Sequence, residues 1–299
     1  SLSSLSVGNG EFAYTVDATG LQTFPEVYKN GVPLGTQSQW GWHSFGNPEN
    51  YKPEEALVEY DFGHGHKELY ATQPKEPDRA KEASDWYRVN PHRLHLGIIG
   101  LELENEVRPS DVQNIQQSLD MWNGIINSRF TLKETPYHIQ TVCHPERDMI
   151  AARLSAQQPA GIKFHFPYPT GGHCDDACNW EANDKHSTTL VSEDAQSAVL
   201  KRTLDATTYY VTISWEGAAK LREKSANYFV LTPTDSVFTF TCQFTPQASA
   251  SPILTFAEVQ QASSGHWQNY WTQGAVADFS QCTDCLLYTS PSPRDKRQS

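Results

Sequence analysis

The sequence contains few cysteines, no long hydrophobic run and no excess of positive charge. Six cysteines in 299 residues, without repeated paired spacing, are too few for a disulfide scaffold. The chain has no run of eighteen or more apolar residues and no basic segment followed by an apolar one, so it predicts neither a membrane helix nor a signal peptide. Because it begins at a serine inside a β-type pattern, we expect that the natural protein extends further upstream.

Negative charge predominates instead. Lys+Arg 23 against Asp+Glu 35 gives a formal net charge of -12. Proteins that bind nucleic acids need a basic surface to meet the phosphates, so we expect no nucleic-acid partner. The content of 38% hydrophobic and 11% aromatic residues is typical of a globular protein, and the length allows one large β domain or two ordinary ones.

Alternation of apolar and polar residues predicts β-strands along most of the chain. Two such runs, 12–17 and 21–24, are separated by Ala18-Thr19-Gly20 and predict a hairpin. Further extended segments are predicted at 57–62, 86–103, 137–142, 161–166, 208–215 and 237–244. Repeated strands of this length, with polar turns between them, indicate a large antiparallel two-sheet sandwich.

Two stretches have the spacing of helices. Ser110 can cap a short helix whose apolar face is formed by Val112, Ile115, Leu119 and Trp122, with Trp122 as the packing anchor. The second stretch, 257–272, includes three large aromatic residues, Trp267, Tyr270 and Trp271. Residues 72–84 are charged, contain two prolines and have no periodicity, which predicts an exposed loop.

An aromatic cluster stands out near the N-terminus. Gln39 is followed by Trp40-Gly41-Trp42-His43, which places three ring side chains within four residues. Sugar rings present apolar C–H faces that pack on indoles, while their hydroxyls accept and donate hydrogen bonds with Gln and His. We therefore interpret Gln39, Trp40, Trp42 and His43 either as a carbohydrate-binding surface or as packing within the core or between domains.

Two clusters contain metal-ligating residue types. His64 and His66 stand two residues apart at the end of a predicted strand, without a third ligand nearby. The segment 173–178 reads His-Cys-Asp-Asp-Ala-Cys, which allows an exposed loop, a local disulfide or a metal site. Cys143 and Cys242 lie on strand patterns and are expected to be small buried side chains. We predict no metal site and no cofactor.

Several runs of the sequence are similar to a known family. They are SVGNGEFAYTVDATGLQTFP, TQSQWGWHSF, NPHRLHLGIIGLEL from Asn90, QQSLDMWNGIINSRF from Gln116, HPERDMIAARLSA from His144 and HWQNYWTQGAVADFSQCTD from His266. Together they resemble the N-terminal β-sandwich domain of the glycoside hydrolase family 65-like enzymes, which belong to the six-hairpin (α/α)-barrel clan. The resemblance extends from Ser4 to Asp284.

This resemblance implies a fold and a division of the chain. Residues 1–256 would form a galactose-mutarotase-like β-supersandwich, and 257–284 would be a helical linker toward an (α/α) barrel. Trp267, Tyr270 and Trp271 would then lie between the two domains. The last residues, 285–299, resemble translated sequencing adapter and are expected to be an artefactual, disordered tail. Related enzymes are often exported by bacteria, so a periplasmic or secreted location is expected for the parent protein.

The same resemblance bears on function. In the family 65-like enzymes the catalytic acid is a glutamate on a barrel helix, and the corresponding position would lie beyond the end of this chain. We therefore predict no catalytic residue here. The chain would be the non-catalytic domain of a glycoside hydrolase or disaccharide phosphorylase. The alternative is a self-contained module that binds carbohydrate or acts as an aldose epimerase, which requires a His and Glu pair as acid and base.

Overall fold

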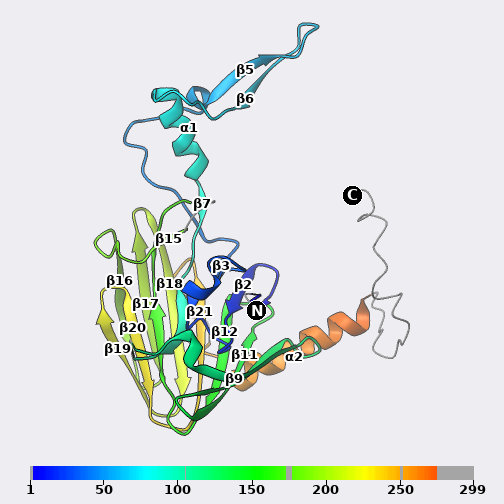
Figure 1. Cartoon of the computed structure of the whole chain (residues 1–299), viewed down its shortest axis with the longest axis vertical. Coiled ribbons are helices and arrows are strands. Elements are labelled where there is room, and N and C mark those ends of the chain that lie inside the picture. Colours follow the sequence, from blue (N-terminus) through cyan, green and yellow to red (C-terminus); the bar gives the residue numbers. More distant parts are fainter. Residues whose placement is uncertain (1–2, 105, 173–176, 250–251, 275–299) are drawn as a thin grey trace.

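The protein is an antiparallel β-sandwich with one long arm (Figure 1). The computed structural model describes residues 3–104, 106–172, 177–249 and 252–274. Its larger layer is an eight-stranded sheet in the order β16 (His186–Glu193), β17 (Ser197–Leu204), β18 (Thr207–Glu216), β21 (Val237–Thr245), β12 (Met149–Ser155), β11 (Thr135–Cys143), β10 (Ile125–Leu132) and β9 (Val112–Asp120). All neighbouring strands in it are antiparallel.

Two smaller sheets form the opposite layer. One has the order β19 (Ala219–Ser225), β20 (Tyr228–Pro233), β13 (Gly161–His165) and β8 (Ile98–Glu102), and the other has the order β1 (Leu5–Gly8), β2 (Phe12–Val16) and β3 (Thr36–Ser38). Both pack on strand β21: the ring centroids of Phe164 and Phe240 are 6.1 Å apart, and those of Phe12 and Phe244 are 5.9 Å apart. The core therefore lies between the two layers.

Strand alternation explains this core. In β21 the side chains of Phe238, Phe240, Cys242 and Phe244 are all buried, as the sequence predicts. Burial of each large side chain contributes about 1.5–3 kcal/mol, which makes this strand a major source of stability. Cys143 on β11 is buried too, so both cysteines on strand patterns are confirmed as core residues.

Helix α2 (Phe256–Gln273) covers part of the other face of the large sheet. Phe256 and Val259 pack there with Ile125, Val142, Met149 and Ala151. The helix begins at a capping box, in which Thr255 and Glu258 bond each other's backbone N–H. It confirms the helix predicted over 257–272. The structure contains no helix, among the residues it describes, that is long and apolar enough to cross a membrane.

The arm projects away from the sandwich (Figure 1). It consists of the 3-10 turn η2 (Pro53–Ala56), the two-stranded ribbon β5 (Leu57–Asp61) and β6 (Lys67–Ala71), and helix α1 (Arg79–Val89). Two-residue strands β4 (Trp42–His43) and β7 (His92–Arg93) join its base to the sandwich. The remaining elements are η1 (Pro25–Tyr28), η3 (Pro109–Asp111) and the pair β14 (Tyr168–Pro169) and β15 (Cys178–Asn179).

Three local predictions are wrong. Residues 21–24 do not form a strand, and β2 pairs with β1 and β3 instead of closing a hairpin. The stretch from Ser110 to Trp122 is not a helix: it consists of the end of η3, strand β9, whose backbone pairs along β10, and the start of the turn after it. Trp122 is half exposed. The predicted loop 72–84 contains the start of α1, which Asp78 caps by accepting from the Lys81 N–H, and this helix also replaces the extended conformation expected at 86–89.

The overall class is nevertheless as predicted. The chain is a mainly β, antiparallel sandwich with a helix at its C-terminal side. Its inserted helix is α1, and not the helix predicted from Ser110. The strands predicted at 57–62, 137–142, 161–166, 208–215 and 237–244 correspond to β5, β11, β13, β18 and β21.

Candidate functional site

A cavity of about 530 Å³ lies where the small three-stranded sheet, the turn after β9 and helix α2 meet. Its lining residues come from segments far apart in the sequence: Ser6, Val7, Gly8, Gly10, Glu11, Phe12, Ala13, Gln37, Ser38, Gln39, Arg93, Leu119, Met121, Gly124, Cys143, Trp267 and Trp271. The volume is within the range of roughly 300–1,000 Å³ that is typical of small-molecule sites.

Small side chains on the outward face of β1, β2 and β3 leave room for this cavity. Gly8 is paired with Ala13 in the sheet, and Ala13 is paired with Gln37. Inward residues of β2 are buried while Ala13 points to solvent, which is the alternation expected of a half-exposed sheet. A larger side chain at position 13 would take up part of this space, and position 8 has no room for one, because a Cβ on Gly8 would lie 2.4 Å from the Phe12 carbonyl oxygen.

Two tryptophans of α2 line the cavity. The Trp267 and Trp271 rings are 6.4 Å apart and within 30° of parallel. The Trp271 indole N–H donates to the Met121 carbonyl over 2.7 Å, and the Ser263 hydroxyl donates to the Asn123 carbonyl over 3.1 Å. These bonds hold the helix against the β9–β10 turn, so the indoles have fixed positions.

Polar groups line the cavity as well. Arg93 on β7 donates from Nη1 to the Ser38 carbonyl over 2.7 Å, and its Cζ lies 4.5 Å from the centroid of the Trp42 ring. Gln37, Gln39 and Glu11 are exposed. No hydrogen bond within the described part of the chain engages the side-chain amides of the two glutamines. They are therefore available to a ligand.

The four residues predicted from the aromatic loop lie in different environments. Gln39 lines the cavity, and Trp42 is 46% exposed beside it against Arg93. Trp40 is partly buried, and its indole N–H donates to Asp148 over 2.6 Å. His43 is buried in a polar cluster under the arm.

The polar cluster of His43 uses both of its ring nitrogens. Nδ1 is 2.9 Å from the Thr207 hydroxyl and Nε2 is 3.0 Å from the Asp205 carboxylate, which also accepts from the Tyr168 hydroxyl. Burial lowers the pKa of His43, and the neighbouring His92 lowers it further. His43 therefore has no nitrogen to offer to a ligand, and it ties β4 to the turn before β18.

The predicted linker residues belong partly to the same cavity. Trp267 and Trp271 line it, whereas Tyr270 is 53% exposed on the outer side of α2. Sequence reasoning did not identify Glu11, Ser38 or Arg93 as part of the site. The pairing of β4 with β7, which sets Trp42 opposite Arg93, is the contact that brings Arg93 to the site.

The candidate metal ligands do not converge. His66 is 3.2 Å from Glu68 on the exposed arm, and His64 lies in the turn before it. Across the residues that the structure describes, no three His, Cys, Asp or Glu side chains are grouped as a metal site requires. Residues 173–176 of the cysteine-rich segment and the predicted tail 285–299 lie outside the described residues.

Gly124 determines how closely α2 approaches the β9–β10 turn. Its φ is +68°, and a Cβ there would lie 2.2 Å from Trp267 Cδ1 and 2.7 Å from Ser263 Oγ. We expect Gly124→Ala to cost about 1–3 kcal/mol of unfolding free energy through overpacking and left-handed strain. Urea unfolding measures the cost, and hydrogen exchange should show earlier opening of the end of α2.

Gly265→Ala on the same helix is the matched control for this prediction. A Cβ at Gly265 would meet nothing within 4 Å, and alanine favours helix, so this variant should be as stable as the parent or more so. Equal effects of the two substitutions would contradict the proposed contact of Gly124 with Trp267.

Comparison with known proteins provides no family assignment. No protein-family profile matches the sequence, and no curated protein matches it significantly. Among solved structures, one described as a kojibiose phosphorylase from human microbiome matches with a TM-score of 0.41 and 10% identity, over 89% of this chain and 35% of that one. A bacterial glucoamylase complexed with acarbose matches with a TM-score of 0.39 and 10% identity, over 60% of this chain and 31% of that one. The chain thus spans about a third of the length of these structures, and neither match assigns it an activity.

Proposed function

We propose that this chain is a non-catalytic, carbohydrate-binding β domain of a glycoside hydrolase or disaccharide phosphorylase. The observation that carries the proposal is the cavity that Trp267 and Trp271 line together with the uncommitted amides of Gln37 and Gln39. Indoles offer apolar faces for sugar C–H groups, and amides offer donors and acceptors for sugar hydroxyls. The resemblance of the sequence to the family 65-like enzymes supports the same substrate class.

The carboxylates at the cavity support a non-catalytic role. Hydrolysis of a glycosidic bond uses a pair of carboxyl groups about 5–10 Å apart. Glu11 is the sole carboxylate among the described residues that line the cavity. A phosphorylase needs one acid and a bound phosphate, and Arg93 is already committed to Ser38 and Trp42. The resemblance to the family 65-like enzymes implies that the catalytic acid belongs to a helical barrel, which we propose as the partner domain next to α2.

Binding of sugars to the isolated chain tests this proposal. Calorimetric titration with maltose, kojibiose and acarbose should give saturable binding in the millimolar range or tighter. Gln39→Ala should weaken it at least threefold, because a hydrogen bond contributes about 0.5–1.5 kcal/mol. Trp271→Phe should weaken it too, since the ring loses its bond to Met121 and part of its area.

Gln157→Ala is the matched control. Gln157 is an exposed glutamine just after the end of β12. The cavity residue Cys143 of β11 pairs with Ile150 near the start of β12, so Gln157 lies far from the cavity. It should leave binding unchanged. The proposal fails if none of the sugars binds, or if the loss is the same in Gln157→Ala and Gln39→Ala. Acceleration of glucose mutarotation by the chain, followed by polarimetry, would favour the epimerase alternative instead.

A further inference from the structure

We propose that the aromatic face of the β5–β6 ribbon is an interface between two copies of this chain. This inference is independent of the proposed sugar cavity. All residues of β5 and β6 after Leu57 are exposed, so the ribbon has no cover on either face within the described part of the chain. An isolated two-stranded ribbon is marginally stable in water, and this one needs support from elsewhere.

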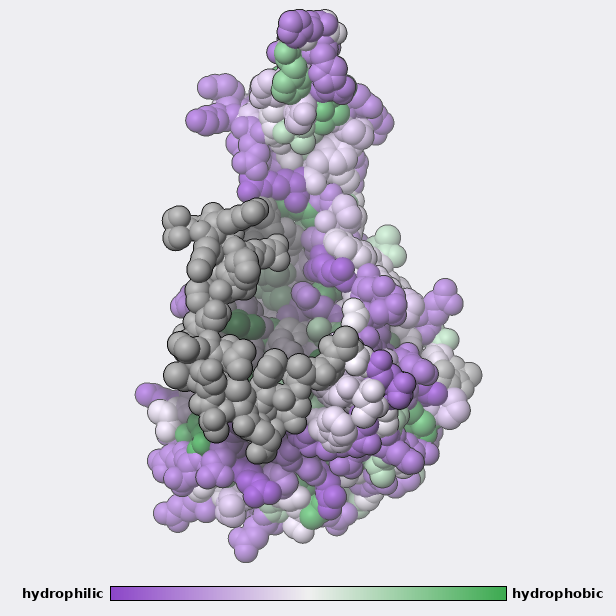
Figure 2. Space-filling view, turned by 90° about the vertical axis from the view of Figure 1, so that its right-hand side faces the viewer, coloured by the Kyte–Doolittle hydropathy of each residue, from purple (hydrophilic) through white to green (hydrophobic). Residues whose placement is uncertain are grey.

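One face of the ribbon collects its aromatic side chains. The register sets Val58 opposite Tyr70 and Tyr60 opposite Glu68, and the Phe62 N–H donates to the His66 carbonyl. The six side chains on this aromatic face are Val58, Tyr60, Phe62, His66, Glu68 and Tyr70. Phe62 is 56% exposed and Tyr70 is 50% exposed. Figure 2 shows hydrophobic spots within the otherwise hydrophilic surface of the arm.

The charges of the ribbon lie mainly on the opposite face. Glu59, Asp61 and Lys67 alternate with the aromatic positions, and Lys67 pairs with Glu59 at 2.9 Å. The one acid on the aromatic face, Glu68, is 3.2 Å from the His66 ring. This face therefore combines four apolar or aromatic side chains with one self-contained polar pair, which suits a partner of the same kind better than a charged one.

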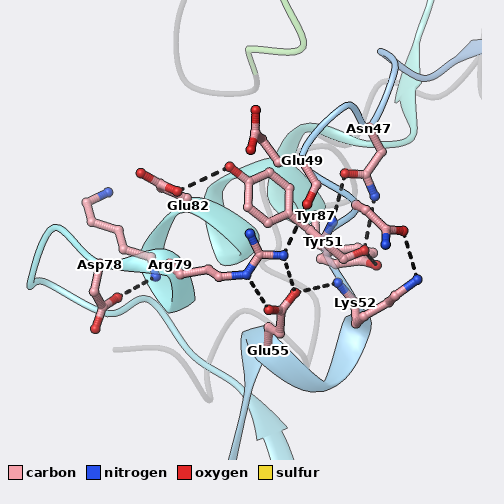
Figure 3. Close-up of polar contacts among 11 residues, drawn as sticks. Asn47, Glu49, Tyr51, Lys52, Glu55, Asp78, Arg79, Glu82 and Tyr87 are labelled. Carbon is pink, nitrogen blue, oxygen red and sulfur yellow. Dashed lines mark hydrogen bonds and ion pairs between the residues drawn. The ribbon is translucent and has the colours of Figure 1, made fainter.

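The base of the arm is built to hold the ribbon in place (Figure 3). Arg79 donates from Nε to Glu55 Oε1 over 2.5 Å and from Nη2 to the Glu49 carbonyl over 3.1 Å, and its guanidinium lies over the Tyr51 ring. Glu55 also accepts from the Lys52 N–H over 2.7 Å. These contacts tie η2 to α1 and fix the base from which the ribbon projects, which lowers the entropy that the arm loses on association.

The α1 side of this base is anchored as well. The Tyr87 hydroxyl donates to the Tyr51 carbonyl over 3.0 Å, and the Tyr51 hydroxyl donates to Glu82 over 3.3 Å. The Trp86 indole N–H donates to the Gly46 carbonyl over 3.1 Å. Such a network would be unnecessary if the ribbon were a loose loop.

The area and the ring geometry favour a second copy. Six half-exposed side chains of this size present roughly 500 Å² per copy, so that two copies packed face to face bury roughly 1,000 Å², where specific interfaces begin. The Tyr60 and Tyr70 rings are 89° apart and the Phe62 and Tyr70 rings 58° apart, so they do not make the flat platform that a polysaccharide chain would need. A two-fold axis through the face would interleave these rings.

Light scattering on the full chain tests the proposal. Between about 1 and 100 µM the parent should convert to a dimer. Phe62→Asp should raise the dissociation constant at least tenfold, as expected for an aromatic anchor that becomes buried in an interface. Leu69→Asp on the opposite face of the ribbon and Tyr270→Asp on α2 should leave it unchanged. Circular dichroism and the melting temperature establish that each variant is folded.

Other results would overturn the proposal. A parent that stays monomeric at 100 µM excludes the dimer, and a dimer that Tyr270→Asp dissociates while Phe62→Asp does not would place the contact on α2. Sedimentation of the monomer with insoluble starch or cellulose, lost in Phe62→Asp, would identify the aromatic face as a polysaccharide platform instead.

Discussion

Replacing Arg202 by alanine is expected to remove about 3–5 kcal/mol of unfolding free energy, because the substitution breaks a buried polar network around a charge. Arg202 lies on β17 in the core and is fully buried. Its guanidinium donates to Thr188 Oγ1 over 2.7 Å and to Asn227 Oδ1 over 2.9 Å, and it stands 2.6 Å from His186 Nδ1. Its Cζ lies 4.9 Å from the centroid of the Phe166 ring.

Within the described part of the chain, neutral acceptors, and not a carboxylate, surround the Arg202 guanidinium. The Arg202 guanidinium also donates to the backbone carbonyls of Ser187 and Pro167, at 3.0 Å and 3.2 Å. Loss of the side chain would leave the buried Pro167 carbonyl without this donor, at about 1–3 kcal/mol, whereas Ser187 is exposed and its carbonyl can reach water. The losses at the individual acceptors are not additive. We therefore expect the total loss of unfolding free energy to be close to that of breaking one buried ion pair.

Urea unfolding measures this loss, and two variants separate its causes. Arg222→Ala removes an exposed arginine of β19 and should change stability by less than about 0.5 kcal/mol. Arg202→Lys keeps the charge but not the planar fork, and it should recover only a small part of the loss. If Arg202→Lys were as stable as the parent, the charge and not the hydrogen-bonded geometry would be the stabilising feature.

Acid is expected to destabilise the fold well above the pH at which carboxylates protonate. The pKa values of His95, His165 and His186 are lowered to about 4, chiefly by burial and, for His165 and His186, also by nearby positive charge that includes Arg202. An unfolded histidine titrates near 6.5. Between about pH 6.5 and 4 the unfolded chain therefore binds more protons than the folded chain. The stabilising contribution is complete above pH 6.5 and is lost as the pH falls.

Urea midpoints at pH 7.5, 6.0 and 5.0 test this expectation. Each of these histidines contributes up to about 1.4 kcal/mol per pH unit in that window. Asp17 acts in the opposite sense, because burial raises its pKa. His186→Asn keeps an acceptor for Arg202 but cannot be protonated, so it should flatten the slope. A slope unchanged in this variant would show that His186 does not take part.

Local pattern was enough to predict much of the sandwich. Strands such as β21 bury every second residue, and this alternation is visible without knowledge of the partner strands. The helix prediction for the stretch before Trp122 was wrong. Val112, Ile115 and Leu119 have a helical spacing, yet pairing with β10 selects the extended conformation. Propensity and periodicity are local, whereas a strand is stabilised by its neighbours.

The cavity could be predicted only in part for the same reason. Gln39, Trp267 and Trp271 were identified by residue type, but as members of two separate sites. They meet because α2 docks beside the β9–β10 turn at Gly124, a contact between segments more than a hundred residues apart. Arg93 enters through the β4–β7 pairing. No spacing in the sequence encodes these approaches.

The strand order of the large sheet constrains how the chain can fold. Strands β9 to β12 and strands β16 to β18 are each joined as consecutive antiparallel neighbours, but within this sheet the two groups are connected only through β21, which comes last among the strands that the structure describes. We therefore expect that during synthesis the edges of β12 and β18 stay unpaired until residues 237–245 have left the ribosome and β21 can form between them. Folding of the sandwich is consequently a late event, and β21 is the strand that closes it.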